Sequence, residues 1–238
     1  MARLRQEAGA GRPDVPPRTR CIPVFRTFAP TDGQISREHV AAPVFRPMIR
    51  IAILASGSGT NAQRLMEHFH GHTQAEVALL GCDQPQAGVL QRAWDHGVPS
   101  YLFNGTQLRE GDVLRELEGQ RIQLIVLAGF MRLIPSAMVR AFPRRIINIH
   151  PALLPKYGGK GMYGHHVHEA VLAAGEQESG ITIHYVNERY DEGEHIAQFR
   201  CPVLSDDTRA SLEARIHALE HAHYPVVVES VVNGIATI

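Results

Sequence analysis

Short runs of branched apolar residues alternate along the chain with segments in which apolar residues recur every three or four positions. The first pattern is typical of buried strands and the second of amphipathic helices. The strand-like runs are Ile49–Ala55, Glu76–Cys82, Ser100–Phe103, Gln123–Ala128, Ile146–His150, Gly180–Val186 and a segment near Ala197–Val203. The helical segments are Asn61–Phe69, Val89–His96, Gln107–Leu117, Ser136–Ala141, His166–Ala174 and a long one near Thr208–Val232.

This alternation predicts an α/β fold. Repeated strand–helix–strand units favour a Rossmann-like, mostly parallel sheet with helices on both faces. The last two strands are joined by Asn187–Glu194, which is too short to hold a crossover helix. We therefore expect an antiparallel pair near the C-terminal end of the chain.

Residues 1–47 differ in composition from the rest of the chain. They are rich in arginine and proline and lack an apolar period, so they can bury little surface to offset the entropy of ordering. We predict that residues 1–47 are a disordered extension, or that the true start is Met48. Residues 48–238 are then expected to form one folded catalytic domain.

Composition narrows the classes of partner and compartment. The chain carries 24 basic and 24 acidic residues, and this balance argues against nucleic acid or an anionic membrane as its main partner. No apolar run approaches the ~20 residues that span a bilayer. The three cysteines (Cys21, Cys82 and Cys201) are widely spaced, which is typical of a reducing compartment. We expect a soluble, cytoplasmic protein.

The strand predicted at Ile146–His150 ends in a candidate site. A residue before proline adopts extended geometry, and Pro151 has no N–H for the sheet, so the strand should stop at His150. Asn148 and His150 are two positions apart and point to the same face. An amide and an imidazole are thus side by side at the carboxyl end of a strand, where open α/β sheets bind ligands.

A glycine-rich turn, Ser56–Asn61, follows the first predicted strand. Its glycines let the backbone approach a ligand closely, and the N-terminus of the next helix favours an anion such as phosphate. The spacing Gly57-x-Gly59-x-x-Ala62 also fits a dinucleotide fingerprint, with Asp83 as the ribose-binding acid. A nicotinamide-binding domain therefore stays open as an alternative.

The histidines raise the question of a metal. His217 and His221 are four positions apart, which suits zinc on one helix face. No acid or cysteine completes a recognisable ligand set in the sequence, so we expect no metal site.

Together, five segments resemble the phosphoribosylglycinamide formyltransferase family, which uses a folate cofactor in purine biosynthesis. They are ASGSGTN at Ala55–Asn61, LAGFMRLI at Leu127–Ile134, INIHPALLPKY at Ile147–Tyr157, HYVNERYDEGEHIAQ at His184–Gln198 and EHAHYP at Glu220–Pro225. The resemblance covers Met48 to about Gly234. It implies transfer of the formyl group of 10-formyltetrahydrofolate, as co-substrate, to the amine of glycinamide ribonucleotide, without a metal.

The resemblance also implies roles for individual residues. Asn148, His150 and Asp191 become the catalytic trio, in which Asp191 raises the pKa of His150 towards neutrality so that His150 is a general acid and oxyanion donor. The residues expected to bind glycinamide ribonucleotide are Gly59, Thr60, Asn61, His217 and Glu220. Those expected to bind folate are Arg109, Met131, Arg132, Leu133, Ile134, Asn148, Asn187, Glu188, Arg189, Tyr190 and Asp191.

Three features of the sequence depart from the family pattern, and related enzymes remain as alternatives. Cys82-Asp83 stands where the family usually has Ser-Asn, His217 where it often has lysine or glutamine, and Gly158–Gly164 is a longer version of a shorter turn. Formyltetrahydrofolate deformylase shares the core but adds an N-terminal regulatory domain. Methionyl-tRNA formyltransferase adds a C-terminal nucleic-acid-binding domain. A non-enzymatic nucleotide-binding module would leave the catalytic trio unexplained.

Overall fold

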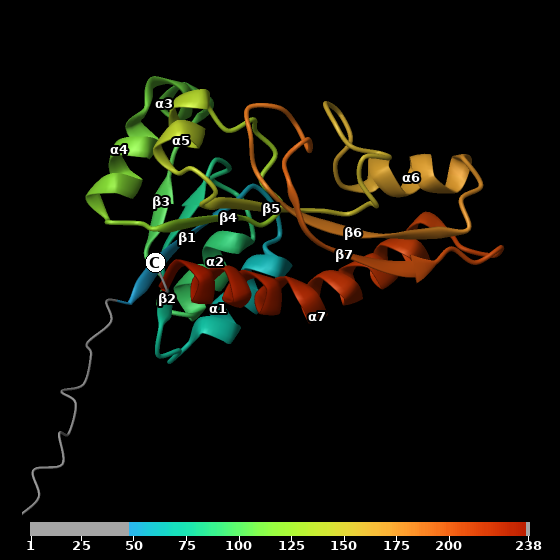
Figure 1. Ribbon diagram of the computed structural model, residues 1–238, viewed down its shortest axis with the longest axis horizontal. Coiled ribbons are helices and arrows are strands. Elements are labelled where there is room, and N and C mark those ends of the chain that lie inside the picture. The colour runs from blue at the N-terminus through green and yellow to red at the C-terminus, as the bar shows by residue number, and fades with distance from the viewer. Residues whose placement is uncertain (1–47, 237–238) are drawn as a thin grey trace, which may run out of the picture. The chain divides into compact units, whose positions relative to one another are not determined.

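The computed structural model describes residues 48–236, which form a seven-stranded sheet with helices on both faces (Figure 1). The expected disorder of residues 1–47 falls outside the described residues. The strands are β1 Ile49–Ala55, β2 Ala75–Cys82, β3 Ser100–Leu102, β4 Leu124–Leu127, β5 Ile146–His150, β6 Glu178–Tyr185 and β7 His195–Pro202. The helices are α1 Thr60–Phe69, α2 Val89–Asp95, α3 Gly105–Glu110, α4 Asp112–Gly119, α5 Ser136–Ala141, α6 His165–Ala173 and α7 Arg209–Ala236.

The strand order is β3-β2-β1-β4-β5-β6-β7, and the first five strands in this order are parallel. The expected antiparallel pair is confirmed as β6 and β7. The structure adds a second antiparallel pairing, because β6 also runs against β5. The predicted α/β class with a mostly parallel sheet is therefore confirmed.

Alternate residues of β1 enter two separate cores, one on each face of the sheet. Ile51 and Ile53 pack on the face covered by α1, α2 and α7, whereas Ala52 and Leu54 pack on the face covered by α3, α4 and α5. All four side chains are fully buried. A strand buried on both faces reads as a continuous apolar run, which is why the sequence IRIAILA identified β1 correctly.

One predicted helix is wrong in its extent. The expected helix Gln107–Leu117 is two helices, α3 and α4, that meet at Gly111. Gly111 has φ +86, a left-handed conformation that favours glycine and ends α3. Each piece is anchored by its own apolar residues, Leu108 in α3 and Val113 with Leu117 in α4.

The long C-terminal helix α7 closes one face of the sheet. Pro225 lies inside it, and the buried side chains of Leu212, Ile216, Tyr224 and Val228 face the core. The Tyr224 hydroxyl donates to the carbonyl oxygen of Leu127 at 2.8 Å, so α7 is tied to the end of β4. Among the described residues, no helix is long and apolar enough to cross a membrane.

Candidate active site

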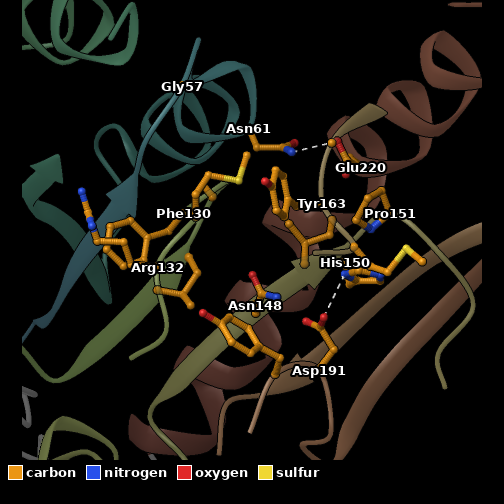
Figure 2. Close-up of a pocket in the computed structure, with 18 of the residues that line it drawn as sticks. Gly57, Asn61, Phe130, Arg132, Asn148, His150, Pro151, Tyr163, Asp191 and Glu220 are labelled. Carbon is orange, nitrogen blue, oxygen red and sulfur yellow. Dashed lines mark hydrogen bonds and ion pairs between the residues drawn. The ribbon is translucent and has the colours of Figure 1, made fainter. Parts of the chain in front are cut away.

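A cavity of about 590 Å³ opens at the carboxyl ends of β1, β4 and β5. Its walls come from the turns after these strands, the loops at 159–164 and 189–191, and one face of α7 (Figure 2). Ligands of open α/β sheets bind at this edge, next to the point where strand order reverses. The cavity therefore lies where the sequence predicts the site.

Asn148 and His150 enter the cavity from β5, as expected from their spacing. The strand ends at His150, directly before Pro151. His150 is 97% buried, since its exposed fraction is 3%. Asp191 approaches from the β6–β7 loop in a left-handed conformation, φ +55, which aspartate tolerates better than most residues.

The His150 ring has a defined tautomer. Its Nε2 donates to the carbonyl oxygen of Tyr157 at 2.8 Å, because a carbonyl can only accept. Its Nδ1 lies 3.6 Å from Asp191 Oδ2. Asp191 Oδ2 also accepts from the Gly159 N–H at 2.9 Å. Both ring nitrogens thus face oxygen acceptors, an arrangement that suits the doubly protonated ring.

Burial disfavours the positive charge of a doubly protonated His150 ring. It lowers the pKa of His150 below its ordinary value, and the raising effects of the Asp191 charge and the Tyr157 carbonyl do not compensate. Asp191 raises the pKa of His150, as expected, but burial outweighs this effect, so the net pKa lies below the ordinary value. His150 is therefore mainly neutral at pH 7.

Asp191 remains ionised. Burial raises its pKa, but the nearby His184 ring, the His150 charge and the Gly159 N–H together lower it by more. The net pKa of Asp191 lies below its ordinary value. The pair at neutral pH is a carboxylate beside a neutral imidazole that can accept one proton at Nδ1.

His184 is a cavity residue that the sequence analysis did not propose. On β6 it is the direct antiparallel partner of Asn148, and its Nε2 accepts from Asn148 Nδ2 at 3.2 Å. Its Nδ1 donates to the Tyr185 carbonyl at 2.9 Å, which fixes the tautomer needed to accept. The amide of Asn148 is therefore held in one orientation, with one N–H still available. The β5–β6 pairing that creates this contact has no signal in the sequence.

The glycine-rich turn after β1 forms the opposite wall of the cavity. Gly59 precedes α1 with φ +78 and no side chain caps the helix, so its first N–H groups are open to an anion. Thr60 and Asn61 line the cavity beside it. Asn61 Nδ2 donates to Glu220 Oε2 of α7 at 2.9 Å, which joins the turn to the last helix.

His217 and Glu220 meet on α7. His217 Nδ1 lies 2.8 Å from Glu220 Oε2, and this hydrogen bond raises the pKa of His217. A partly protonated His217 therefore stands next to the anion-binding turn. The structure thus brings together all five residues expected to bind the nucleotide substrate.

The turn after β4 forms a more apolar wall. Met131 and Leu133 are nearly half exposed in the cavity, whereas Ile134 is buried beneath them. Arg132 Nε donates to the buried carboxylate of Asp83 at 2.6 Å. This pairing argues against the dinucleotide alternative, because the acid expected to hold a ribose is already occupied by a guanidinium.

Of the remaining residues expected to bind folate, Arg189 and Tyr190 line the cavity, but Arg109, Asn187 and Glu188 do not. Arg109 Nη2 donates to Thr106 Oγ1 at 3.2 Å. Glu188 pairs with Arg140 at 3.1 Å, and Asn187 Oδ1 accepts from the Arg189 N–H at 2.9 Å. These three side chains are engaged outside the cavity wall.

The cavity also includes residues that sequence reasoning missed. They are His168 and Glu213, together with the consecutive residues Gly159, Lys160, Gly161, Met162, Tyr163 and Gly164. His168 is buried, and burial lowers its pKa. In the described part of the chain, the cluster of potential metal ligands is the exposed set His165, His166 and Glu169. It lies at the start of α6, where the helix dipole disfavours a cation.

Comparison with known proteins agrees with this geometry. Residues 49–228 match the family model described as formyl transferase. The trifunctional purine biosynthetic protein adenosine-3 of Drosophila melanogaster is 41% identical over 197 residues, which are 79% of this chain and 14% of the fly protein. The chloroplastic phosphoribosylglycinamide formyltransferase of Vigna unguiculata is 40% identical over 187 residues, which are 76% of this chain and 60% of that protein.

Similarity to a solved structure extends the match to the fold. Glycinamide ribonucleotide transformylase 1 from Geobacillus kaustophilus superimposes with a TM-score of 0.72 at 40% sequence identity. The match covers 78% of this chain and 100% of that one. The matched residues include the whole cavity described above. The chain therefore belongs to the formyl transferase family.

Proposed function

We propose that the chain transfers the formyl group of 10-formyltetrahydrofolate to the amine of glycinamide ribonucleotide. The product is N-formylglycinamide ribonucleotide, an intermediate of purine biosynthesis. The observation that carries the proposal is the position of the His150–Asp191 pair between two unlike walls, an anion-binding turn with α7 on one side and an apolar turn on the other. The names of the relatives support the same reaction.

Each wall suits one substrate. The phosphoribosyl group of the nucleotide fits the turn at Gly59, Thr60 and Asn61, with His217 and Glu220 from α7. The pteridine of the folate fits the wall formed by Met131–Ile134, with Arg189 and Tyr190 at its edge. A flat heterocycle buries most favourably against apolar side chains, and a phosphate against open N–H groups.

The chemistry assigns a role to each member of the catalytic trio. The amine attacks the formyl carbon, so its oxygen becomes negative and the attacking nitrogen positive. The free N–H of Asn148 and the Nε2–H of His150 can donate to that oxygen. Because Nε2 holds the oxygen and Nδ1 faces Asp191, the proton that the amine releases reaches Nδ1 through water, giving an imidazolium paired with Asp191. The imidazolium then returns a proton as N10 of the folate leaves with the electron pair of the broken C–N bond.

In the structure, Nε2 of His150 is bound to the Tyr157 carbonyl. The formyl oxygen therefore has to replace that carbonyl when the substrates bind. Formyl transfer to an amine needs no metal, and the proposal includes none. We place the reaction in the cytoplasm, which is supported by Cys82 and Cys201, the two described cysteines, both of which are free thiols.

An assay with the full chain tests the proposal. Purified protein is incubated with 10-formyltetrahydrofolate, with and without glycinamide ribonucleotide, and the products are measured by mass spectrometry. We expect formylated nucleotide and tetrahydrofolate in equal amounts, and a rate lower by about 10²–10³ with the His150→Ala variant. Release of formate without the nucleotide would indicate deformylase activity and contradict the proposal.

A further inference from the structure

The loop 159–164 forms a wall of the cavity that no assigned role explains. Six consecutive residues of this loop line the cavity. The loop is held at its base by the catalytic pair, since His150 binds the Tyr157 carbonyl and Asp191 binds the Gly159 N–H. Its position is therefore fixed relative to the reacting groups.

Three glycines of the loop are required by the conformation of the backbone and not by close packing. Gly159, Gly161 and Gly164 have φ of +95, +92 and +53, in the region that side-chain-bearing residues rarely adopt. A Cβ added at any of the three would meet nothing within 4 Å. Lys160 and Tyr163, which lie between these glycines, both line the cavity.

Tyr163 stands between the anion-binding turn and the catalytic pair. Figure 2 shows its ring between Asn61 and His150, on the side of the cavity where Asn61 meets Glu220. The ring is 49% exposed and packs edge-on against His166, with the ring centroids 5.4 Å apart. Within residues 48–236, its hydroxyl has no hydrogen-bond partner. A phenol held in this way can donate to a phosphate or ribose oxygen.

Lys160 supplies charge to the same wall. The other Lys and Arg side chains of the cavity are engaged, since Arg132 pairs with Asp83 and Arg189 with Glu192. Lys160 has no ion pair with any described residue. A phosphate group carries about two negative charges near neutral pH, and the helix N-terminus offers only about half a positive charge. His217 is only partly protonated, and Glu213 and Glu220 add negative charge to the cavity, so a cation besides His217 favours phosphate binding.

We propose that Tyr163 and Lys160 bind the phosphoribosyl group of the nucleotide substrate, with the hydroxyl as a hydrogen-bond donor and the ammonium as a counter-charge. This inference rests on the proposed function, because it assigns further residues to the same site. It makes the loop 159–164 a second nucleotide-binding element that faces the turn at Gly57–Asn61.

The test is to measure the affinity for each substrate separately. Isothermal titration of the full chain with glycinamide ribonucleotide, and separately with tetrahydrofolate, compares wild type, Tyr163→Phe and Lys160→Gln. We expect each variant to bind the nucleotide about tenfold more weakly, as for loss of one hydrogen bond to a charged group, and tetrahydrofolate as wild type does. Added salt should weaken nucleotide binding less in Lys160→Gln than in wild type.

Two matched controls separate this role from a structural one. Tyr190→Phe changes a tyrosine on the folate side and should leave nucleotide binding unchanged. Lys156→Gln removes an exposed lysine that pairs with Glu176 outside the cavity, and should change neither affinity. Unchanged nucleotide affinity in Tyr163→Phe and Lys160→Gln would overturn the inference. Formyl transfer by the wild-type protein would then still support the proposed function. Equal weakening of both ligands would also overturn it, and absence of nucleotide binding by wild type would overturn both.

Discussion

His150 Nδ1 and Asp191 Oδ2 lie 3.6 Å apart, close enough for an ion pair but too far for a good hydrogen bond. At this distance Asp191 stabilises the neutral ring only weakly. Once Nδ1 takes a proton, the two groups attract and the contact can shorten. The pair is thus arranged to stabilise a proton that arrives during the reaction.

Loss of either partner should slow formyl transfer. We expect His150→Ala and Asp191→Asn each to lower kcat by about 10²–10³, the usual effect of removing an oxyanion donor or its support. Because both act through one protonation, the double variant should lose much less than the product of the single losses. Steady-state rates of the three variants measure this, and multiplicative losses would show that Asp191 acts independently.

The pH titration of His150 follows from its burial. The folded-state pKa lies below the ordinary value of about 6.5, so the ring should remain neutral until the pH falls under that value. Asp191→Asn removes a charge that raises this pKa and should lower it further. NMR titration of the His150 ring checks both statements. A midpoint above 6.5, or one indifferent to Asp191, would contradict them.

Two glycines of the anion-binding turn should respond differently to the same substitution. A Cβ at Gly59 would lie 2.4 Å from Val89 Cγ2 and at a strained φ, so Gly59→Ala should lower both stability and nucleotide affinity. A Cβ at Gly57 meets nothing within 4 Å, so Gly57→Ala should leave the fold and its stability unchanged. It should lower only the affinity for the nucleotide. Melting curves and titrations with both substrates separate the two effects. Equal loss of folate binding in Gly57→Ala would make the turn merely structural.

Nucleotide affinity should depend on pH through His217. Its pKa is raised by Glu220, so the cationic form persists above the ordinary value of about 6.5 and is lost as pH rises through the folded pKa. Affinity for glycinamide ribonucleotide should therefore decrease from pH 6 to pH 8.5. The variant His217→Gln should flatten this part of the profile. An identical slope in the variant would assign the pH dependence to another group.

The Asp83–Arg132 pair should contribute to stability. Asp83 is buried, so Arg132→Leu leaves its carboxylate without a counter-charge, at a cost of about 1–3 kcal/mol in the free energy of unfolding. In the double variant Asp83→Asn/Arg132→Leu, part of this loss should return because no charge is buried. Urea denaturation measures the difference. Equal stability of the Arg132→Leu and double variants would mean that the charge of Asp83 is not what matters.

Residues 1–47 should be dispensable. The cavity described above is built from residues between Gly57 and Glu220, and residues 1–47 lack a core-forming period. We expect protein that starts at Met48 to melt at the same temperature and turn over at the same rate as the full chain. A large loss of either quantity would show that the extension is part of the enzyme.

The sequence predicted those parts of the fold that depend on local pattern. The bounds of β1 and β5 are correct because both are short apolar runs with clear ends, at Ser56 and Pro151. The break between α3 and α4 was missed because one glycine within a helical pattern does not show its φ. The antiparallel pairing of β5 with β6 depends on a long connection that carries no directional signal.

The residues of the candidate site could likewise be predicted only where a local sequence pattern marks them. Asn148, His150 and the Gly59–Asn61 turn were predictable, since each sits in a short motif at the end of a strand. His184 was not, because its contact with Asn148 joins two strands distant in sequence. Tyr163 was not, because its place in the cavity depends on the path of a glycine-rich loop. The effect of Asp191 on the pKa of His150 was predicted in its direction, but the larger effect of burial was not, since it depends on how tightly the surrounding loops enclose the ring.

The hydrogen bond between Asn61 and Glu220 joins residues 159 positions apart, near the two ends of the folded region. During synthesis, the anion-binding turn leaves the ribosome long before α7 does. The proposed nucleotide pocket therefore cannot form on the nascent chain while only the first strands have folded. Binding of the nucleotide should protect α7 against proteolysis and hydrogen exchange, because the ligand favours the state in which the last helix is docked. The enzyme thus gains its substrate site and its last piece of tertiary structure in the same step.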